Sequence, residues 1–333
     1  MNTHDLDATA RALVTSGKGI LAADESTPTI EKRFKGVGIP CTEENRRGYR
    51  ELLFTTPGLS EFISGVILFD ETIRQKAADG TPFVGVLKKH KIIPGIKVDK
   101  GTKPLAGFTA EKITEGLDGL RMRLAEYGEL GARFTKWRAV ITIGPNMPSL
   151  ACLEVNARSL AQFAALSQEA GLVPIVEPEV LMDGDHTIER HFEVTEAALK
   201  LVFNALFEHS VRLQAMLLKP NMVLSGKDCP QQANVEQTAE ATLRCMLETV
   251  PAAVPGIVFL SGGQSEEQAT EHLKVLNQLG PAPWELSFSF GRALQTQAMN
   301  VWLGKPENVT AAQNALHHRA QCNSAARFCA GVS

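Results

Sequence analysis

The sequence has few aromatic residues, no long apolar run and no paired-cysteine motif. Aromatic residues are 6% of the 333 residues, and only two of them are tyrosines, Tyr49 and Tyr127. No apolar run approaches the length of about 18 residues that spans a membrane, and the polar N-terminus does not look like a signal peptide. The six cysteines include no C-x-x-C pair, which indicates reduced thiols and argues against zinc. We therefore expect a cytoplasmic protein.

The chain also has no large excess of positive or negative charge. The 34 basic residues nearly balance the 37 acidic ones, giving a net charge of -3. We therefore expect neither nucleic acid nor a membrane surface as a partner. The eight histidines form no H-E-x-x-H motif and the chain has no P-loop. These absences argue against a metal site and nucleotide hydrolysis, so we expect no metal and no cofactor.

A short apolar run followed by a longer amphipathic stretch recurs along the chain. Eight such runs occur, at 19–23, 63–69, 94–98, 137–143, 172–176, 215–218, 256–260 and 286–290. Helix-like segments lie between them, at 159–170, 187–209, 235–249, 265–278 and 292–303. This alternation predicts βα units in a parallel sheet, and eight units favour an α/β fold of the (β/α)₈ TIM-barrel type over a doubly wound sheet.

Helix-start signals and the two ends of the chain complete the predicted organisation. Ser265 is followed by Glu266 and Glu267, as at the first turn of a helix, and Thr109 followed by Glu111 and Lys112 suggests a second start. We expect a single barrel domain over residues 1–333, with an extra N-terminal helix at about 3–16 and a helical tail at about 305–333.

Charged residues lie at the ends of most of the predicted strands, where barrel enzymes place their catalytic groups. A single charged residue at such a position more often has a surface or ion-pairing role. Many charges at one barrel mouth are costly unless they bind or react, and Lys136 with Arg138, and Glu177 with Glu179, are spaced to share a face. The charged residues are Asp24, Lys97, Lys136, Arg138, Glu177, Glu179, Lys219 and Arg292.

Lys219 follows an apolar run and is the predicted nucleophile. A partly desolvated lysine beside a second cation, here Lys136, is more readily neutral and can attack a ketone to form a Schiff base. The resulting iminium withdraws electrons, so that a neighbouring carbon–carbon bond can break. Glu177 and Glu179 are suited to the acid–base steps, and Asp24 to taking the proton from the hydroxyl that becomes a carbonyl.

Two glycine-containing strand ends predict a phosphate site. Ser261-Gly262-Gly263 and Gly291-Arg292 follow the last two runs and offer backbone N–H groups, a hydroxyl and a guanidinium. Lys32 and Arg33 are candidates for a second phosphate, although such a pair is more often only a solvated face.

Nine ordered motifs between residues 5 and 325 resemble the class I, Schiff-base, fructose-1,6-bisphosphate aldolases. They are GKGILAADEST (17–27), GIKVDKG (95–101), LDGL (117–120), KWR (136–138), VPIVEPE (173–179), DGDH (183–186), LLKPNM (217–222), FLSGGQSEE (259–267) and FSFGRAL (288–294). The resemblance implies reversible cleavage of fructose 1,6-bisphosphate to dihydroxyacetone phosphate and glyceraldehyde 3-phosphate, in glycolysis and gluconeogenesis. It also implies a homotetramer.

The same resemblance implies a role for each matching residue. Lys219 would form the Schiff base, Glu177 would be the acid–base residue with Glu179 hydrogen-bonded beside it, and Asp24 would handle the proton of the C4 hydroxyl. Lys136 and Arg138 would be the cationic pair beside the imine. Substrate would be bound by Lys97, by Ser261, Gly262, Gly291 and Arg292 at the C1 phosphate, and by Ser26, Thr29, Lys32 and Arg33 at the other phosphate.

The chain departs from well-studied members in two places. Thr29 stands where animal members have a serine, which keeps the hydroxyl. The C-terminus has no tyrosine, which leaves open the group that protonates the enamine and the preference between fructose 1,6-bisphosphate and fructose 1-phosphate.

Two other functions remain open at this stage. One is another Schiff-base barrel aldolase or transaldolase acting on sugar phosphates, against which the double phosphate site argues. The other is a non-catalytic anion-binding relative, against which the intact set of Asp24, Glu177 and Lys219 argues.

Overall fold

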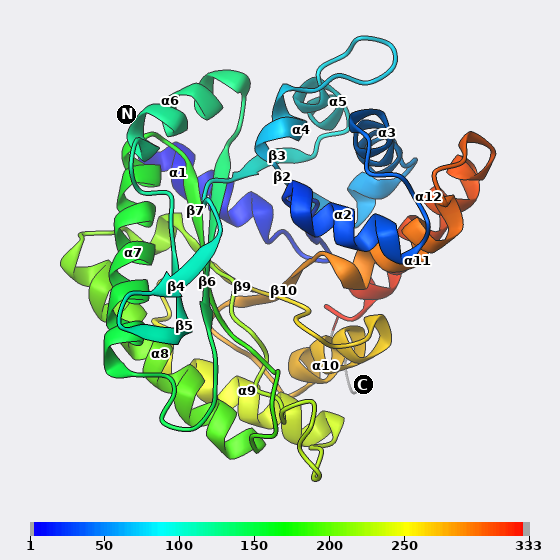
Figure 1. Ribbon diagram of the computed structural model, residues 1–333. Helices are drawn as coiled ribbons and strands as arrows, with labels where there is room; N and C mark the ends of the chain where they lie inside the picture. Colours follow the sequence, from blue (N-terminus) through cyan, green and yellow to red (C-terminus); the bar gives the residue numbers. More distant parts are fainter. Residues whose placement is uncertain (1–2, 329–333) are drawn as a thin grey trace.

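The computed structural model describes residues 3–328, which contain a closed barrel of parallel strands (Figure 1). The predicted (β/α)₈ TIM-barrel fold is therefore confirmed. Around the barrel the order is β1-β10-β9-β8-β7-β6-β3-β2. The barrel strands are β1 (Gly19–Ala22), β2 (Ile63–Leu68), β3 (Ile93–Lys97), β6 (Phe134–Ile141), β7 (Val173–Val180), β8 (Leu217–Leu218), β9 (Gly256–Phe259) and β10 (Glu285–Phe290).

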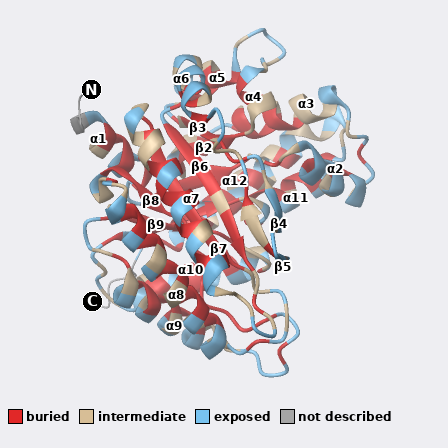
Figure 2. Cartoon of the chain, turned by 60° about the vertical axis from the view of Figure 1, so that its left-hand side comes forward, coloured by how far each residue is buried: buried red, intermediate tan, exposed pale blue. Residues whose placement is uncertain are grey.

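Helices surround the barrel, with their inner faces buried and their outer faces exposed (Figure 2). This is the arrangement that lets amphipathic helices cover a sheet that is apolar on its outer face. The α-helices are α1 (Thr3–Leu13), α2 (Thr27–Gly36), α3 (Glu43–Phe54), α4 (Asp70–Arg74), α5 (Phe83–Lys89), α6 (Leu120–Leu130), α7 (Leu150–Glu169), α8 (Ile188–Glu208), α9 (Val235–Thr249), α10 (Glu266–Gln278), α11 (Arg292–Trp302) and α12 (Val309–Ala325). Short 3₁₀ turns occur at η1 (Leu59–Glu61), η2 (Leu213–Ala215) and η3 (Pro306–Asn308).

Helix α1 covers the N-terminal end of the barrel. Its Leu13, together with Val14, packs in one cluster with residues of the barrel interior such as Ile20 and Phe134. A Cβ atom on Gly95 would lie 2.3 Å from the Phe134 ring, so this close approach requires glycine. The apolar plug at this end leaves the opposite, C-terminal end of the barrel for polar side chains.

The C-terminal segment is held beside the N-terminal end of the barrel, close to the end of α1. Arg327 follows α12, donates hydrogen bonds to the main-chain carbonyls of Thr15 and Leu286, and pairs with Glu285 at 2.6 Å. Residues 329–333 of the predicted tail lie outside the described residues.

Two strands are longer than the sequence suggested. β6 begins at Phe134, three residues before the predicted start, and β7 continues through Pro178 to Val180. Because proline has no N–H to donate to a ladder, a strand is expected to end near Pro178. The neighbouring strand β8 already ends at Leu218, so on that side Pro178 has no ladder bond to lose. The N–H of Val180 is instead accepted by the side chain of Asn221, 2.9 Å away.

The predicted helix start at Thr109 was wrong. Residues there form an antiparallel hairpin of β4 (Thr102–Leu105) and β5 (Phe108–Thr114) between β3 and α6. Glu111 does not serve as an acidic residue in a first helical turn. Its carboxylate accepts hydrogen bonds from the main chain and hydroxyl of Ser149, at 2.7 and 2.6 Å, and joins the hairpin to the start of α7.

Candidate active site

A cavity of about 540 Å³ lies at the C-terminal ends of the barrel strands. Seven cationic side chains and four carboxylates line it, which suits an anionic ligand. The cavity brings together all fifteen residues predicted for the site: Asp24, Ser26, Thr29, Lys32, Arg33, Lys97, Lys136, Arg138, Glu177, Glu179, Lys219, Ser261, Gly262, Gly291 and Arg292. Their placement in one cavity leaves their individual roles as predictions.

The period of two along each strand explains why charges meet here. Side chains two residues apart share a face, so the rows that fill the barrel interior continue upward into the cavity. On β7 the interior residue Ile175 is followed by Glu177, and after β8 the interior residue Leu217 is followed by Lys219. On β6 the row runs from Phe134 to Lys136. Each row is apolar inside the barrel and charged at the mouth.

Four of these side chains form one connected cluster. The Lys219 Nζ atom lies 3.1 Å from one oxygen of Glu177, and the Lys136 Nζ atom lies 3.1 Å from the other. Lys136 also lies 2.7 Å from a carboxylate oxygen of Asp24. Glu177 thus separates the two lysines, and Lys136 separates the two carboxylates. The side chains of Lys136, Glu177 and Lys219 are almost completely shielded from solvent, and that of Asp24 is 12% exposed.

Mutual charge controls the protonation of this cluster. Burial alone would raise the pKa of Asp24 and of Glu177, but Lys136 and Lys219 outweigh burial and hold both pKa values below their ordinary range. Burial would lower the pKa of Lys136, but Asp24 and Glu177 raise it well above its ordinary value. The two carboxylates are therefore ionised at neutral pH, and Lys136 is a permanent cation.

Arg138 and Glu179 form a second pair at the rim of the cluster. The guanidinium of Arg138 donates a charge-assisted hydrogen bond to the Glu179 carboxylate. The β6–β7 register places Arg138 opposite Glu177, two residues before Glu179. Burial would lower the pKa of Arg138, but Glu179 and Glu177 raise it above its usual range. Arg138 thus adds positive potential beside the lysine cluster.

One end of the cavity is built from the strand ends after β9 and β10. Ser261 and Gly262 follow β9, while Gly291 is the N-cap of α11 and Arg292 is its first residue. Arg292 donates to the main-chain carbonyl of Gly262 and, in the part of the chain that the structure describes, has no carboxylate within ion-pair distance. Burial, followed by Arg33, lowers the pKa of Arg292. An uncompensated guanidinium beside a helix N-terminus favours binding of a phosphate.

The other end is formed by the N-terminal part of α2. The hydroxyls of Ser26 and Thr29 lie 3.1 Å apart, and Lys32 lines the cavity with them. Arg33 is ion-paired with Glu25, a buried carboxylate that also pairs with Arg50 at 2.7 Å. The sequence interpretation assigned no role to Glu25, whose position directly after Asp24 was the only signal.

Two further polar residues were not identified as site residues from sequence. The buried carboxylate of Asp99 lies 2.7 Å from the Lys97 Nζ atom and accepts the main-chain N–H of Arg138 at 3.2 Å. It therefore fixes a lysine of the cavity and the strand beside it. Ser289 lines the cavity from β10, and its buried hydroxyl has no hydrogen-bond partner among residues 3–328. Serines two residues apart in an otherwise apolar strand, Ser287 and Ser289, were the available signal.

The described residues offer neither a metal-binding cluster nor a membrane-spanning helix. No group of three or more histidine, cysteine, aspartate or glutamate side chains there is arranged to hold a metal ion. Within the same residues, no helix combines the length and the apolarity that crossing a membrane requires.

Replacing Asp24 by Asn tests the charge balance through the pH dependence of stability. Because the pKa of folded Asp24 lies below its unfolded value of about 3.9, its ionisation stabilises the fold above that value and this stability is lost as the pH falls toward the folded pKa. We expect the wild type to exceed Asp24→Asn in unfolding free energy by a constant margin from pH 8 to 5, and by less below about pH 4. Urea unfolding at each pH measures the margin, and a margin that closes between pH 8 and 5 would contradict the assignment.

Comparisons with known proteins identify relatives of this chain over nearly its whole length. A family model described as glycolytic, fructose-bisphosphate aldolase class-I, matches residues 5–331. A protein of Xanthomonas campestris pv. campestris named probable fructose-bisphosphate aldolase class 1 is 60% identical over 327 residues, covering 98% of each chain. Fructose-bisphosphate aldolase 4, cytosolic, of Arabidopsis thaliana is 54% identical and is matched over 83% of its length, against 98% of this chain. A solved structure of fructose-bisphosphate aldolase from Plasmodium falciparum superposes with a TM-score of 0.96 at 50% identity, covering 98% of this chain and 94% of that one.

Proposed function

We propose, from the premise that this chain belongs to the class I fructose-bisphosphate aldolase family, that Lys219 is its Schiff-base residue and that Glu177 and Asp24 are its proton-transfer groups. The activity of the family is the reversible cleavage of fructose 1,6-bisphosphate to dihydroxyacetone phosphate and glyceraldehyde 3-phosphate, in glycolysis and gluconeogenesis. One observation carries the assignment of residues. The Lys219 amine lies 3.1 Å from the buried Glu177 carboxylate at the base of the cationic cavity.

The first half of the proposed reaction forms the imine. Glu177, within hydrogen-bond distance of the Lys219 nitrogen, takes a proton from the Lys219 ammonium, and the amine so formed attacks the C2 carbonyl carbon of the sugar. One amine proton moves to the carbonyl oxygen to give a carbinolamine. Glu177 then returns its proton to the carbinolamine hydroxyl, which leaves as water, and the nitrogen keeps one proton in the iminium. Glu179, paired with Arg138, keeps that guanidinium in place beside Glu177.

The second half breaks the bond between C3 and C4. Asp24 accepts the proton of the C4 hydroxyl as its C–O bond becomes a carbonyl, and the C3–C4 electron pair moves into the iminium to form an enamine. Lys136, held as a cation 2.7 Å from Asp24, stabilises the negative charge that develops on the C4 oxygen. Glyceraldehyde 3-phosphate leaves, C3 of the enamine is protonated, and water hydrolyses the imine to release dihydroxyacetone phosphate from Lys219.

The two ends of the cavity are suited to the two phosphates. We assign the C1 phosphate to Ser261, Gly262, Gly291 and Arg292, and the C6 phosphate to Ser26, Thr29, Lys32 and Arg33, with Lys97 binding the sugar between them. The uncompensated guanidinium of Arg292 supports the first assignment, because a bound phosphate would supply its missing counter-charge.

Replacing Arg292 by Ala, and separately Lys32 by Ala, tests these assignments. We expect Arg292→Ala to raise the KM for both fructose 1,6-bisphosphate and fructose 1-phosphate by about tenfold to a hundredfold, the effect of losing a charge-assisted hydrogen bond. Lys32→Ala should raise the KM for the bisphosphate alone, because fructose 1-phosphate has no C6 phosphate. Steady-state kinetics on both sugars measure the difference. An unchanged KM in Arg292→Ala would show that Arg292 does not bind the C1 phosphate.

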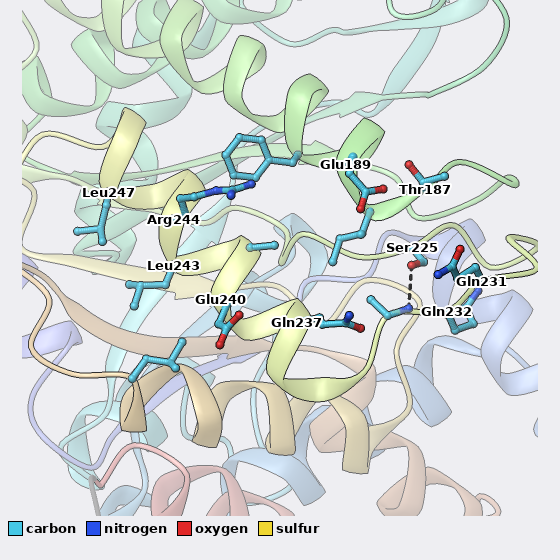
Figure 3. Close-up of a pocket in the computed structure, with 15 residues that line it drawn as sticks. Thr187, Glu189, Ser225, Gln231, Gln232, Gln237, Glu240, Leu243, Arg244 and Leu247 are labelled. Carbon is cyan, nitrogen blue, oxygen red and sulfur yellow. Dashed lines mark hydrogen bonds between the residues drawn. The ribbon is translucent and has the colours of Figure 1, made fainter.

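Assembly and location follow as further proposals. The single barrel domain, residues 1–333, would form a homotetramer in the cytoplasm, and relatives named as cytosolic or cytoplasmic isozymes support the location. A groove of about 620 Å³ beside α8 and α9, lined by both polar and apolar side chains, is a candidate surface for subunit contact (Figure 3). Leu247 and Leu279 line it at 55% and 39% exposure, and the Arg244 guanidinium lies 4.4 Å from the centroid of the Phe192 ring. Sedimentation equilibrium measures the subunit number.

A further inference from the structure

The turn between β9 and α10 has a buried support that the proposed reaction does not use. Gln264 and His272 are 9% and 6% exposed, and they lie behind the Ser261–Gly262 strand end. The Gln264 side-chain nitrogen donates to the main-chain carbonyl of Ser261 at 3.1 Å. The Nδ1 atom of His272, on α10, lies 2.6 Å from the side-chain oxygen of Gln264. A continuous hydrogen-bonded path therefore connects α10 to the peptide between Ser261 and Gly262.

The polarity of this path is fixed by its two ends. A main-chain carbonyl can only accept, so the Gln264 amide must direct its nitrogen toward Ser261 and its oxygen toward His272. The His272 proton must then be on Nδ1, which donates to Gln264. Burial lowers the pKa of His272 to about 4, so this neutral tautomer persists across the physiological pH range.

The consequence for the cavity comes from the planarity of the peptide bond. In a trans peptide the C=O and the next N–H point in opposite directions. The Ser261 carbonyl is directed inward by two donors, the main-chain N–H and the side-chain amide of Gln264, both at 3.1 Å. The N–H of Gly262 is therefore directed the other way, toward the cavity that Ser261 and Gly262 line. Gly262 has a φ of +57°, a conformation in which glycine avoids strain.

We propose that Gln264 and His272 are positioning residues that hold the Ser261–Gly262 peptide with its N–H facing the C1 phosphate. Without them the peptide can rotate, and its carbonyl oxygen would then face the phosphate and repel it. This inference rests on the proposed function, because it takes the Ser261 turn as the C1-phosphate site. Neither residue contacts the reacting carbons, so their effect is on binding and not on the chemical step.

Two substitutions at Gln264 test the donor. Gln264→Glu still accepts from His272 but presents an acceptor to the Ser261 carbonyl, while Gln264→Met removes both bonds without adding charge. We expect both to raise the KM for fructose 1,6-bisphosphate and for fructose 1-phosphate by about tenfold, with kcat changed less than about twofold. The Ki of inorganic phosphate as a competitor should rise in parallel. An effect in Gln264→Glu alone would indicate the new charge and overturn the proposal.

His272 provides the matched pair. His272→Phe keeps the ring but removes the donor, whereas His272→Gln restores one, so the KM should rise in the first and largely recover in the second. Rates are normalised to the fraction of chains labelled by borohydride with saturating dihydroxyacetone phosphate, so partial unfolding does not imitate a binding defect. An unchanged KM at a normal labelled fraction would overturn this inference alone. Failure of the wild type to label would instead overturn the proposed function.

Discussion

Borohydride reduction in the presence of dihydroxyacetone phosphate should inactivate the wild type irreversibly and leave a mass adduct on Lys219. The Lys219 amine is buried beside Glu177, so the imine forms in a site that limits its hydrolysis and remains available for reduction. Lys219→Arg keeps a cation near Glu177 but removes the nucleophile. We expect it to lose about 10⁴-fold or more in kcat, the scale seen when a covalent nucleophile is removed, and to yield no adduct.

Lys97→Arg is the matched control for this experiment. Lys97 lines the same cavity and is ion-paired with Asp99 at 2.7 Å. Because its proposed role is in binding and not in imine formation, we expect its variant still to label on Lys219 when dihydroxyacetone phosphate is saturating. Peptide mapping by mass spectrometry locates the adduct, and the kinetics measure the loss. Labelling on Lys97 or Lys136, or persistent labelling of Lys219→Arg, would show that the nucleophile has been assigned to the wrong residue.

The barrel was predictable because its signal is repeated eight times along the chain. Runs such as 256–260 and the capping pattern at Ser265 agreed closely with β9 and α10. The strand limits failed where the chemistry is concentrated. Lys136 and Glu177 are charged, so the sequence places them at the limits of apolar runs. Both lie within strands, because each side chain is on the interior face of its strand at the barrel mouth.

The site itself was predictable only in part. The fifteen residues reach one cavity because they follow strands whose C-terminal ends converge. The partners that support them come from elsewhere and left little sequence signal. Glu25 is shared by Arg33 and Arg50, which are 8 and 25 residues away. His272 acts through Gln264 on a peptide that neither residue adjoins, a relation that no local pattern encodes.

The hairpin of β4 and β5 is a second case in which contacts distant in sequence were not predictable from the local pattern. A threonine followed by acidic residues starts many helices, but at Glu111 the carboxylate forms hydrogen bonds with Ser149 across the fold. The local pattern is thus overridden where the chain makes tertiary contacts, here between residues 38 positions apart.

Glu177→Gln should separate the two proton-transfer roles that the cluster combines. The substitution conserves volume but leaves Lys219 without its carboxylate and Lys136 with Asp24 alone. Because dehydration of the carbinolamine needs the acid, we expect kcat to fall by about 10² to 10⁴-fold and the rate of borohydride labelling to fall with it. The fold should also lose stability at pH 7, since a buried lysine is then incompletely compensated.

Asp24→Asn is the decisive comparison, because dihydroxyacetone phosphate has no C4 hydroxyl. If Asp24 acts only when the C3–C4 bond breaks, its variant should lose cleavage of fructose 1,6-bisphosphate yet still label with dihydroxyacetone phosphate at close to the wild-type rate. Glu177→Gln should lose both. Lys136 contacts both carboxylates, so its geometry alone does not separate the roles. Equal loss of labelling in the two variants would mean that the four groups act as one electrostatic unit, and that separate acid and base roles cannot be assigned to them.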